Sequence, residues 1–233
     1  RFVAENLQLG VNWDSEASAV RLTRRPVLAL GLSQGDLITQ WGEPERRDLS
    51  ERGYTWLVYP DYQDYLMVGV ADEQVAAVYR HGTGWQLSNG LRQGMDAGLC
   101  ARYLEGYVIR DYGSYAIYVG TQDAYTLYFD AEGQAYAVLA ENALYMDKCR
   151  ITAAVLDGFS RQFLDLVNVE RTRKALTPLV WDDTVAKVAK SHAVDMAGMN
   201  MYTHQGSDGS TPYGRMETAG FRDFYQIEII AQA

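Results

Sequence analysis

Two hydrophobic patterns divide the chain. Up to about residue 145 the apolar residues form short runs, and after residue 150 they recur at the three-and-four spacing of helices. The short runs are bounded by Gly, Asp and Pro turn residues, which is typical of strands joined by hairpins. These runs are residues 56–59, 65–70, 75–79, 115–119, 125–129 and 135–139. The pattern therefore predicts a β-rich first part, preceded by a lead-in strand or ordered arm over residues 1–25.

The β-rich part contains an internal repeat. Residues 31–35 read Gly-Leu-Ser-Gln-Gly, and residues 90–94 read Gly-Leu-Arg-Gln-Gly. Each copy continues into a short stretch with helical spacing and then into the strand-length runs. We therefore predict two copies, about 27–85 and 86–145, in which a helix is followed by antiparallel strands. Such copies place helices on one face of a sheet, which is an α+β fold.

Helical spacing after residue 150 predicts two helices. Ser160 is the expected cap of the first helix, on which Phe163, Leu164 and Val167 share an apolar face. We expect Pro178 to end this helix, because proline disfavours a helical conformation at the residue before it.

The second helix is expected to begin at Asp182 or Asp183, where a carboxylate suits the helix dipole, and to end near Asn200. Its apolar residues predict a buried stripe: Val185, Val188, Ala189, His192, Met196 and Met199. Because His192 lies on this stripe, we interpret it as a hydrogen-bonded core histidine. His81, in the first part of the chain, is expected in a solvent-exposed turn.

Composition narrows the choice of partners. The formal net charge of −9 argues against a nucleic-acid partner, since phosphate binding needs a basic surface. No apolar run in the sequence approaches the roughly 18 residues of a membrane-spanning helix. Cys100 and Cys149 leave two alternatives open, a disulfide that would stabilise by about 4 kcal/mol or two separate reduced thiols. The strand tyrosines suit a half-buried sheet surface, and an aromatic recognition face is the alternative.

Hydroxyl residues near a histidine raise the hypothesis of a hydrolase. Ser207, Ser210 and Thr211 lie close to His204 in the sequence, and a hydrolase needs a nucleophile beside a base. Residues 208–212 read first as a turn, however, because Asp and Gly set a bend and Pro follows it. The sequence contains no Gly-x-Ser-x-Gly elbow either. The pattern around these hydroxyl residues therefore favours a turn over a catalytic site.

Four segments of the β-rich part carry a resemblance to a known module. They are residues 31–35, the Trp-Gly-Glu-Pro of 41–44, the Tyr-Thr-Trp of 54–56, and residues 65–70. Together they resemble the CAP-associated N-terminal module found ahead of CAP domains in Gram-positive bacteria. The resemblance covers about residues 27–139 and implies an architecture and a location rather than a reaction.

Five segments of the second part carry a stronger resemblance, because they occur in matching order at matching separations. They are residues 166–171, 176–182, 189–196, 202–204 and 208–215. They resemble the bacterial CAP domain, of the secretory-protein and pathogenesis-related superfamily, from Ser160 to the end of the chain. The implied fold is the first half of a CAP α-β-α sandwich. We therefore predict two domains, 1–150 and 151–233.

The resemblance also implies a site. CAP domains line a cavity with two histidines and two acidic residues, and His204 matches the first histidine. Glu228 takes the first acidic position, in a segment where the family has Gly-Glu-Asn-Ile-Ala. Here Ile227 and Ile229 replace the glycine and the asparagine, which changes the local turn and its hydrogen bonds. His204 and Glu228 are the candidate catalytic and ligand-binding residues.

The second histidine and second acidic residue of the family have no match before Ala233. We expect a truncated or cleaved chain, or one that another copy completes. Two ligands are too few for a closed metal site, so no cofactor is expected. A divalent metal such as zinc would require residues outside this chain. A protein partner or a second copy is expected to cover the exposed edge of the CAP sheet.

These resemblances predict an extracellular or envelope-associated protein. The predicted role is a binding or interaction module at the cell envelope, with a small lipid or peptide as the ligand. One alternative is a CAP-type peptidase that uses His204 and Glu228. A second alternative is a non-catalytic structural protein of the envelope or spore. The sequence leans against an enzyme, because no constellation of residues in it demands catalysis.

Overall fold

The computed structural model describes residues 9–14, 18–24, 28–222 and 226–231. By its internal contacts the chain forms two compact units, Arg1–Pro178 and Leu179–Ala233. In the predicted N-terminal arm, β1 (Leu9–Asp14) pairs antiparallel with β2 (Ala19–Arg24) as a hairpin. The other residues of that arm, apart from Ser18, lie outside the described part of the chain.

The two predicted repeats build one antiparallel sheet. The first repeat supplies four strands: β3 (Arg46–Leu49), β4 (Thr55–Tyr59), β5 (Asp64–Ala71) and β6 (Gln74–Gly82). The second supplies another four: β7 (Val108–Asp111), β8 (Tyr115–Val119), β9 (Asp123–Phe129) and β10 (Ala135–Asn142). The order across the sheet is β3-β4-β5-β6-β10-β9-β8-β7. In each repeat the first strand lies at an edge of the sheet and the fourth lies at the centre. The halves are thus related by an approximate twofold axis at the β6–β10 pair.

All six apolar runs of the sequence lie inside strands. The two outer strands, β3 and β7, were not predicted, because each is only four residues long and carries charged residues. Short, charged strands are typical of sheet edges, where they discourage pairing with other chains.

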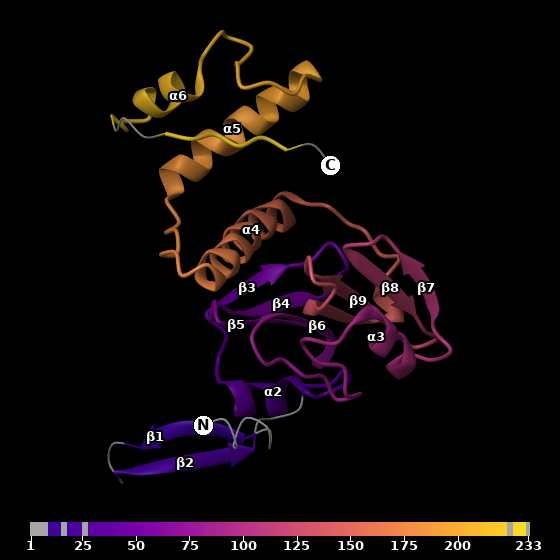
Figure 1. Cartoon of the computed structure of the whole chain (residues 1–233). Helices are drawn as coiled ribbons and strands as arrows, with labels where there is room; N and C mark the ends of the chain where they lie inside the picture. Colours follow the sequence, from indigo (N-terminus) through magenta and orange to yellow (C-terminus); the bar gives the residue numbers. More distant parts are fainter. Residues whose placement is uncertain (1–8, 15–17, 25–27, 223–225, 232–233) are drawn as a thin grey trace. The chain divides into compact units, whose positions relative to one another are not determined.

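Helices α2 (Gln34–Trp41) and α3 (Ala97–Tyr103) open the two repeats (Figure 1). Ser33 and Asp96 cap them by accepting hydrogen bonds from backbone N–H groups of the first turn. Leu37 of α2 and Cys100 of α3 are fully buried in one hydrophobic core on the same face of the sheet. The predicted α+β arrangement, with helices on one face of a sheet, is confirmed. No helix in the described part of the chain is long and apolar enough to cross a bilayer.

The two cysteines are separate thiols. Cys100 is buried in the core, and Cys149 is exposed. Burial raises the pKa of the Cys100 thiol to about 11. Of the two alternatives left open by the sequence, the structure therefore has reduced cysteines, with Cys100 used as a small apolar residue.

The opposite face of the sheet is covered by α4 (Ala153–Arg173), which starts earlier than predicted. Its cap is Thr152, which accepts from the backbone N–H of Val155. Ser160 lies inside the helix and donates its hydroxyl to the carbonyl of Leu156. The prediction of Ser160 as the cap was wrong, because an earlier threonine caps the same helix.

The buried face of α4 is largely polar, which corrects a second prediction. Phe163 is 70% exposed, and the predicted apolar face with Leu164 and Val167 is not the one that packs on the sheet. The buried residues of α4 are Val155, Gly158, Gln162, Asp165, Asn168 and Val169. The sheet surface under α4 carries buried charged side chains, so the helix packs on that surface with polar side chains that pair with them.

One carboxylate holds α4 to the sheet. Asp165 is 4% exposed, and its oxygens accept from Arg46 at 2.6 Å, Tyr65 at 3.1 Å and Tyr62 at 3.2 Å. Arg46 also binds Asp48, through Nε at 2.8 Å. Every charge in this network is paired, which is the condition for keeping a carboxylate buried.

These contacts place α4 in the first compact unit, which ends at Pro178. The predicted domain boundary near residue 150 lies before α4, because helical spacing identifies where a helix begins but not what it packs against.

His81 is buried rather than exposed, which corrects its predicted position in a turn. It lies in β6 and is 4% exposed. Its Nε2 lies 2.9 Å from a carboxylate oxygen of Glu170 on α4. Burial lowers the pKa of His81 and outweighs the raising effect of Glu170, so the ring is neutral at pH 7.

We predict that Asp165→Asn destabilises the first unit by about 3 kcal/mol, because it removes the buried carboxylate and leaves the half-buried Arg46 with one of its two carboxylate partners. Urea unfolding followed by tryptophan fluorescence measures this change. The exposed Asp147→Asn serves as the control and should change stability by less than about 0.5 kcal/mol. Equal stability of the two variants would show that the network does not hold α4.

Candidate functional site

The second unit begins with α5 (Asp183–Met199), whose two ends agree with the prediction. Asp182 caps the helix by accepting from the backbone N–H groups of Thr184 and Val185. Asn200 ends it in a left-handed conformation with φ of 50°, which asparagine tolerates better than most residues. A second short helix, α6 (Pro212–Thr218), follows, with its cap at Thr211.

The predicted buried stripe of α5 is only partly buried. Only His192 of this stripe is fully buried, at 3% exposure, while Val185 is 38% exposed and Ala189 is exposed. Within the described part of this unit, α6 is the only other helix, so α5 has little to pack against. The stripe prediction was therefore right only for His192.

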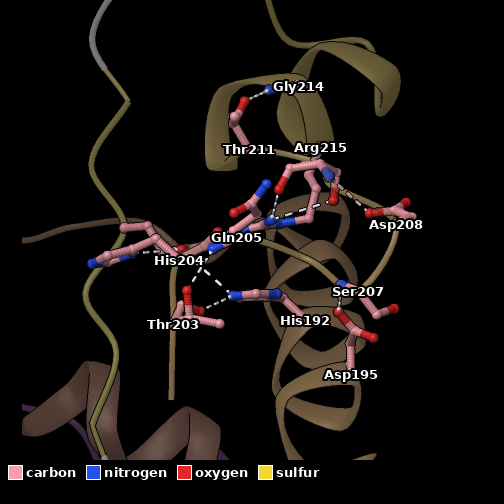
Figure 2. A network of polar contacts seen from close by, with 12 residues as sticks. His192, Asp195, Thr203, His204, Gln205, Ser207, Asp208, Thr211, Gly214 and Arg215 are labelled. Carbon is pink, nitrogen blue, oxygen red and sulfur yellow. Dashed lines mark hydrogen bonds and ion pairs between the residues drawn. The ribbon is translucent and has the colours of Figure 1, made fainter. Parts of the chain in front are cut away.

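His192 fixes the loop that carries His204. Its Nε2 donates to the carbonyl oxygen of Thr203 at 2.9 Å (Figure 2). Its Nδ1 is buried and has no hydrogen-bond partner among the described residues. The interpretation as a core histidine is thus confirmed, with one of the two ring nitrogens satisfied. Because Thr203 directly precedes His204, the bond from His192 to the Thr203 carbonyl also holds the backbone at His204 in place.

Glu228 joins three segments of the second unit. It lies in the extended segment 226–231 and is 2.8 Å from Nδ1 of His204 through Oε1. Its Oε2 accepts from Nη2 of Arg215 on α6 at 2.6 Å. His192 approaches Oε1 with Nε2 at 3.7 Å. The structure therefore brings the two predicted site residues, His204 and Glu228, into direct contact.

Arg215 is the site residue that sequence reasoning missed. It binds Glu228 and also donates to the carbonyl oxygens of His204, at 3.1 Å, and Ser210, at 3.1 Å (Figure 2). Its side chain is only 12% exposed. Arg215 lies three residues after Pro212, in the segment 208–215 that resembles the CAP family. The resemblance assigned no role to this arginine.

The carboxylate of Glu228 is held ionised. Partial burial would raise its pKa, but the hydrogen bonds from Arg215 and His204 outweigh burial and lower it. The imidazole Nδ1 of His204 faces this carboxylate, so Nδ1 carries the proton and donates it. In the neutral ring, Nε2 of His204 is then an acceptor, and no described residue is hydrogen-bonded to it.

A shallow hollow lies beside this pair. The residues that line it are Tyr202, Thr203, His204, Gln205, Glu228, Ile229 and Ile230. The hydroxyl of Tyr202 donates to the carbonyl of Ile230, which ties the two walls together. The hollow therefore combines apolar isoleucines with one histidine acceptor and one fixed negative charge.

The hydroxyl residues of the nearby loop are engaged elsewhere. Thr211 caps α6, and the Ser210 hydroxyl lies 3.4 Å from Nη1 of Arg215. The backbone N–H of Ser207 donates to Asp195. Among the described residues, no hydroxyl is hydrogen-bonded to His204. The reading of residues 208–212 as turn chemistry agrees with these bonds.

The donor set for a metal is incomplete in the described part of the chain. No group of three His, Cys, Asp or Glu side chains with metal-binding geometry occurs among the described residues. Both oxygens of Glu228 already have partners, and His204 is the one histidine among the residues that line the hollow. A structural or catalytic zinc needs three or four ligands, so these residues do not fit one by themselves.

Comparison with known families matches both parts of the chain. Residues 30–142 match the model described as CAP-associated N-terminal. Residues 164–233 match the model of the Cysteine-rich secretory protein family. The second match begins inside α4. Part of this helix therefore belongs to the CAP region by sequence, although the helix packs against the sheet of the N-terminal module.

Two relatives from Bacillus subtilis are similar in sequence. The uncharacterized membrane protein YlbC is 26% identical over 84% of this chain and 67% of its own length. The uncharacterized protein YkwD is 29% identical over 28% of this chain and 25% of its own length.

Two solved structures share the fold. One is an extracellular protein containing an SCP domain from Bacillus anthracis, with a TM-score of 0.71 and 21% identity over 89% of this chain and 80% of that one. The other is a cysteine-rich secretory protein from Staphylococcus aureus, with a TM-score of 0.58 and 14% identity over 83% and 73%. The family models thus place a CAP-associated N-terminal region at residues 30–142 and a CAP region of the Cysteine-rich secretory protein family at residues 164–233, and the two solved structures share this fold.

Proposed function

We propose that this protein is an extracytoplasmic binding module in which the hollow beside His204 and Glu228 takes a small lipid or peptide. The observation that carries the proposal is the fixed pair itself. Glu228 orients His204 at 2.8 Å, and Arg215 fixes Glu228 in turn at 2.6 Å. A side chain held in this way presents Nε2 at a defined position with little conformational entropy left to lose on binding.

The lining of the hollow defines the chemistry of the ligand. Nε2 of neutral His204 accepts a hydrogen bond, so the ligand needs an N–H or O–H donor. Ile229, which is 87% exposed, and Ile230 offer apolar surface beside it. The negative charge of Glu228 disfavours an anionic head group. A monoacylglycerol or an apolar peptide amide has both the donor and the apolar part.

Binding is favoured over peptide hydrolysis by the hydrogen bonds of the site. A serine or threonine nucleophile would need a hydrogen bond to the base, and none of the described hydroxyls has one to His204. The His204–Glu228 pair alone resembles a base and its orienting group. The peptidase therefore stands as an alternative outcome of the test below.

A location outside the cytoplasm is supported by similarity. The structural neighbour from Bacillus anthracis is described as extracellular, and the one from Staphylococcus aureus as a secretory protein. The relative YlbC is described as a membrane protein, which agrees with a place at the cell envelope. The acidic net charge of −9 disfavours adhesion to anionic lipid by charge alone.

We predict that His204→Ala weakens binding of a monoacylglycerol or of an apolar tetrapeptide amide about tenfold, because one hydrogen bond worth about 1.4 kcal/mol is lost. Isothermal titration calorimetry of the full chain with each probe measures the affinity. Lys187→Ala, an exposed change on α5, is the matched control and should bind as the parent does.

Three results would redirect this proposal. Binding that is equal in His204→Ala and the parent would remove the hollow as the site. Cleavage of a peptide library by the parent, lost in His204→Ala, would favour the peptidase. No binding of either probe would favour a structural role at the envelope or spore.

We predict that the stability of the second unit decreases as the pH falls below about 4.5, the ordinary pKa of a glutamate. Because the pKa of Glu228 is lowered in the folded state, its ion pairs contribute fully above that pH and are lost as the pH falls through the folded pKa. NMR titration of the Glu228 carboxyl carbon, with amide exchange in residues 200–222, measures both effects.

Glu228→Gln should remove this part of the pH dependence and lower the stability at pH 7. Glu217→Gln, on the exposed side of α6, should retain the dependence of the parent. A Glu228 carboxyl that titrates at or above its ordinary pKa would contradict the proposed role of Arg215.

A further inference from the structure

An aspartate occurs at the same position in both halves of the sheet. Asp64 is the first residue of β5 and pairs with Gly82 of β6. Asp123 is the first residue of β9 and pairs with Asn142 of β10. The approximate twofold axis at the β6–β10 pair relates these two hairpins, so the two aspartates are equivalent.

The partner of this aspartate differs between the halves. Arg80 lies in β6 two residues before the strand partner of Asp64, and it donates from Nη2 to the carboxylate of Asp64. The residue in the same position relative to Asp123 is Ala140 of β10. Among the residues that the structure describes, none forms an ion pair with Asp123. The second half has therefore kept the carboxylate and lost the arginine.

A cavity of about 290 Å³ lies beside Asp123, in the first unit and on the sheet face that carries α2 and α3. Asp123 and Ala140 both line it, so the space lies where an arginine side chain at position 140 would extend. In the first half, by contrast, the Arg80 side chain is present and only 10% exposed. The volume is close to that of the smallest ligand pockets, about 300 Å³. Apolar walls are supplied by Leu28, Leu30, Val78 and Leu87.

Two tyrosine hydroxyls fix the carboxylate of Asp123. Tyr107 donates to Oδ1 at 2.6 Å, and Tyr125 donates to Oδ2 at 2.7 Å. Burial, together with the hydrogen bond to Asp123, raises the pKa of Tyr107 to about 12, so this hydroxyl keeps its proton at neutral pH. Burial and the same carboxylate also raise the pKa of Tyr125. Asp123 is thus held in one orientation, and each of its oxygens retains a lone pair for a further donor.

We propose that this cavity binds a small organic cation, a guanidinium group on a short aliphatic arm, with Asp123 as its counter-ion. The cation takes the place beside Asp123 that the Arg80 guanidinium takes beside Asp64, and its aliphatic arm lies along the apolar walls. A guanidinium supplies several N–H donors in one plane and is more weakly hydrated than an ammonium, which suits a partly apolar cavity. The source is either a free small molecule or an arginine side chain of a peptide, and the test distinguishes them.

The fixed carboxylate argues against other classes of ligand. A metal ion needs several ligands, and no group of three His, Cys, Asp or Glu side chains that could hold one occurs in the described part of the chain. An anion would be repelled by Asp123. A neutral ligand would leave this carboxylate without a counter-charge, so the charge of the ligand is the property that the test must isolate.

The test compares a cation with a neutral molecule of nearly the same shape. Ethylguanidinium and ethylurea are titrated separately into the full chain, and NMR follows the Asp123 carboxyl carbon and the rings of Tyr107 and Tyr125. Ethylguanidinium should shift these signals. Ethylurea should bind at least about tenfold more weakly, because it lacks the positive charge.

A capped Gly-Arg-Gly peptide, titrated in parallel, distinguishes the two sources of the cation. Tighter binding of the peptide than of ethylguanidinium would support an arginine side chain as the natural ligand. Weaker binding of the peptide, with ethylguanidinium still bound, would support a free small cation.

Variants of the full chain separate the effect of charge from that of space. Asp123→Asn should reduce the affinity for ethylguanidinium about tenfold, since charge-assisted hydrogen bonds are lost. Ala140→Leu keeps the charge but fills part of the cavity, and it should reduce the affinity by a similar factor. Glu132→Gln removes an exposed carboxylate of the same repeat and should bind as the parent does. Urea unfolding shows which variants fold, and because the first two act by different means, either one alone tests the site.

Three results would overturn the proposal. Equal affinity of Asp123→Asn and the parent for ethylguanidinium would exclude this carboxylate as the counter-ion. Equal affinity of the parent for ethylurea and ethylguanidinium would show that the cavity does not select a cation. Shifts at other carboxylates, with none at Tyr107 and Tyr125, would mean general attraction of cations to a chain of net charge −9.

Discussion

The burial of one carboxylate, Asp165, is the constraint on which the first unit depends. A buried carboxylate is stable only with its charge and lone pairs satisfied, and here Arg46, Tyr62 and Tyr65 satisfy them. These partners come from β3, from β5 and from the turn between β4 and β5, so they specify one position of α4 on the sheet. An apolar contact of the same area would allow the helix to slide or rotate.

The same helix links the two family regions. The match to the cysteine-rich secretory protein family begins at residue 164, inside α4, while the matched N-terminal module contains the sheet that α4 packs on. The helix is therefore part of the CAP region in sequence and part of the sheet module in packing. The module does not merely precede the CAP region in the chain, because it buries one face of that region's first helix.

Sequence patterns predicted the elements that obey simple burial rules. Strand β8 agrees with its predicted run to the residue, because Ala116 and Tyr118 face the core and alternate with residues on the other face. The caps of α5 were also predictable, since Asp182 and Asn200 act through local backbone bonds. Local rules suffice where the partner lies within a few residues.

The polar face of α4 and the position of His81 were not predictable in this way. Asp165 and Glu170 read as solvent-exposed in a helical pattern, and only the arginine and histidine on distant strands explain their contacts. His204 and Glu228 came from resemblance to a family rather than from spacing. Arg215 was missed because a lone arginine after a turn has no pattern of its own.

The comparison of the two sheet halves shows that a repeated fold can keep its strand order and change its polar contacts. Both halves have an arginine at the end of the same register row, Arg46 and Arg110, but the twofold relation places Ala124 where the first half has Tyr65. Only the first half retains a strand carboxylate beside its arginine. Asp48 neutralises Arg46 even before α4 docks and also accepts from Gln162 of that helix. The position equivalent to Asp48 in the second half is Tyr112, so this half lacks both the tyrosine and the carboxylate that make Arg46 part of an internal joint. The strand order alone therefore does not position a helix on the sheet, because the polar contacts to Asp165 occur in one repeat only.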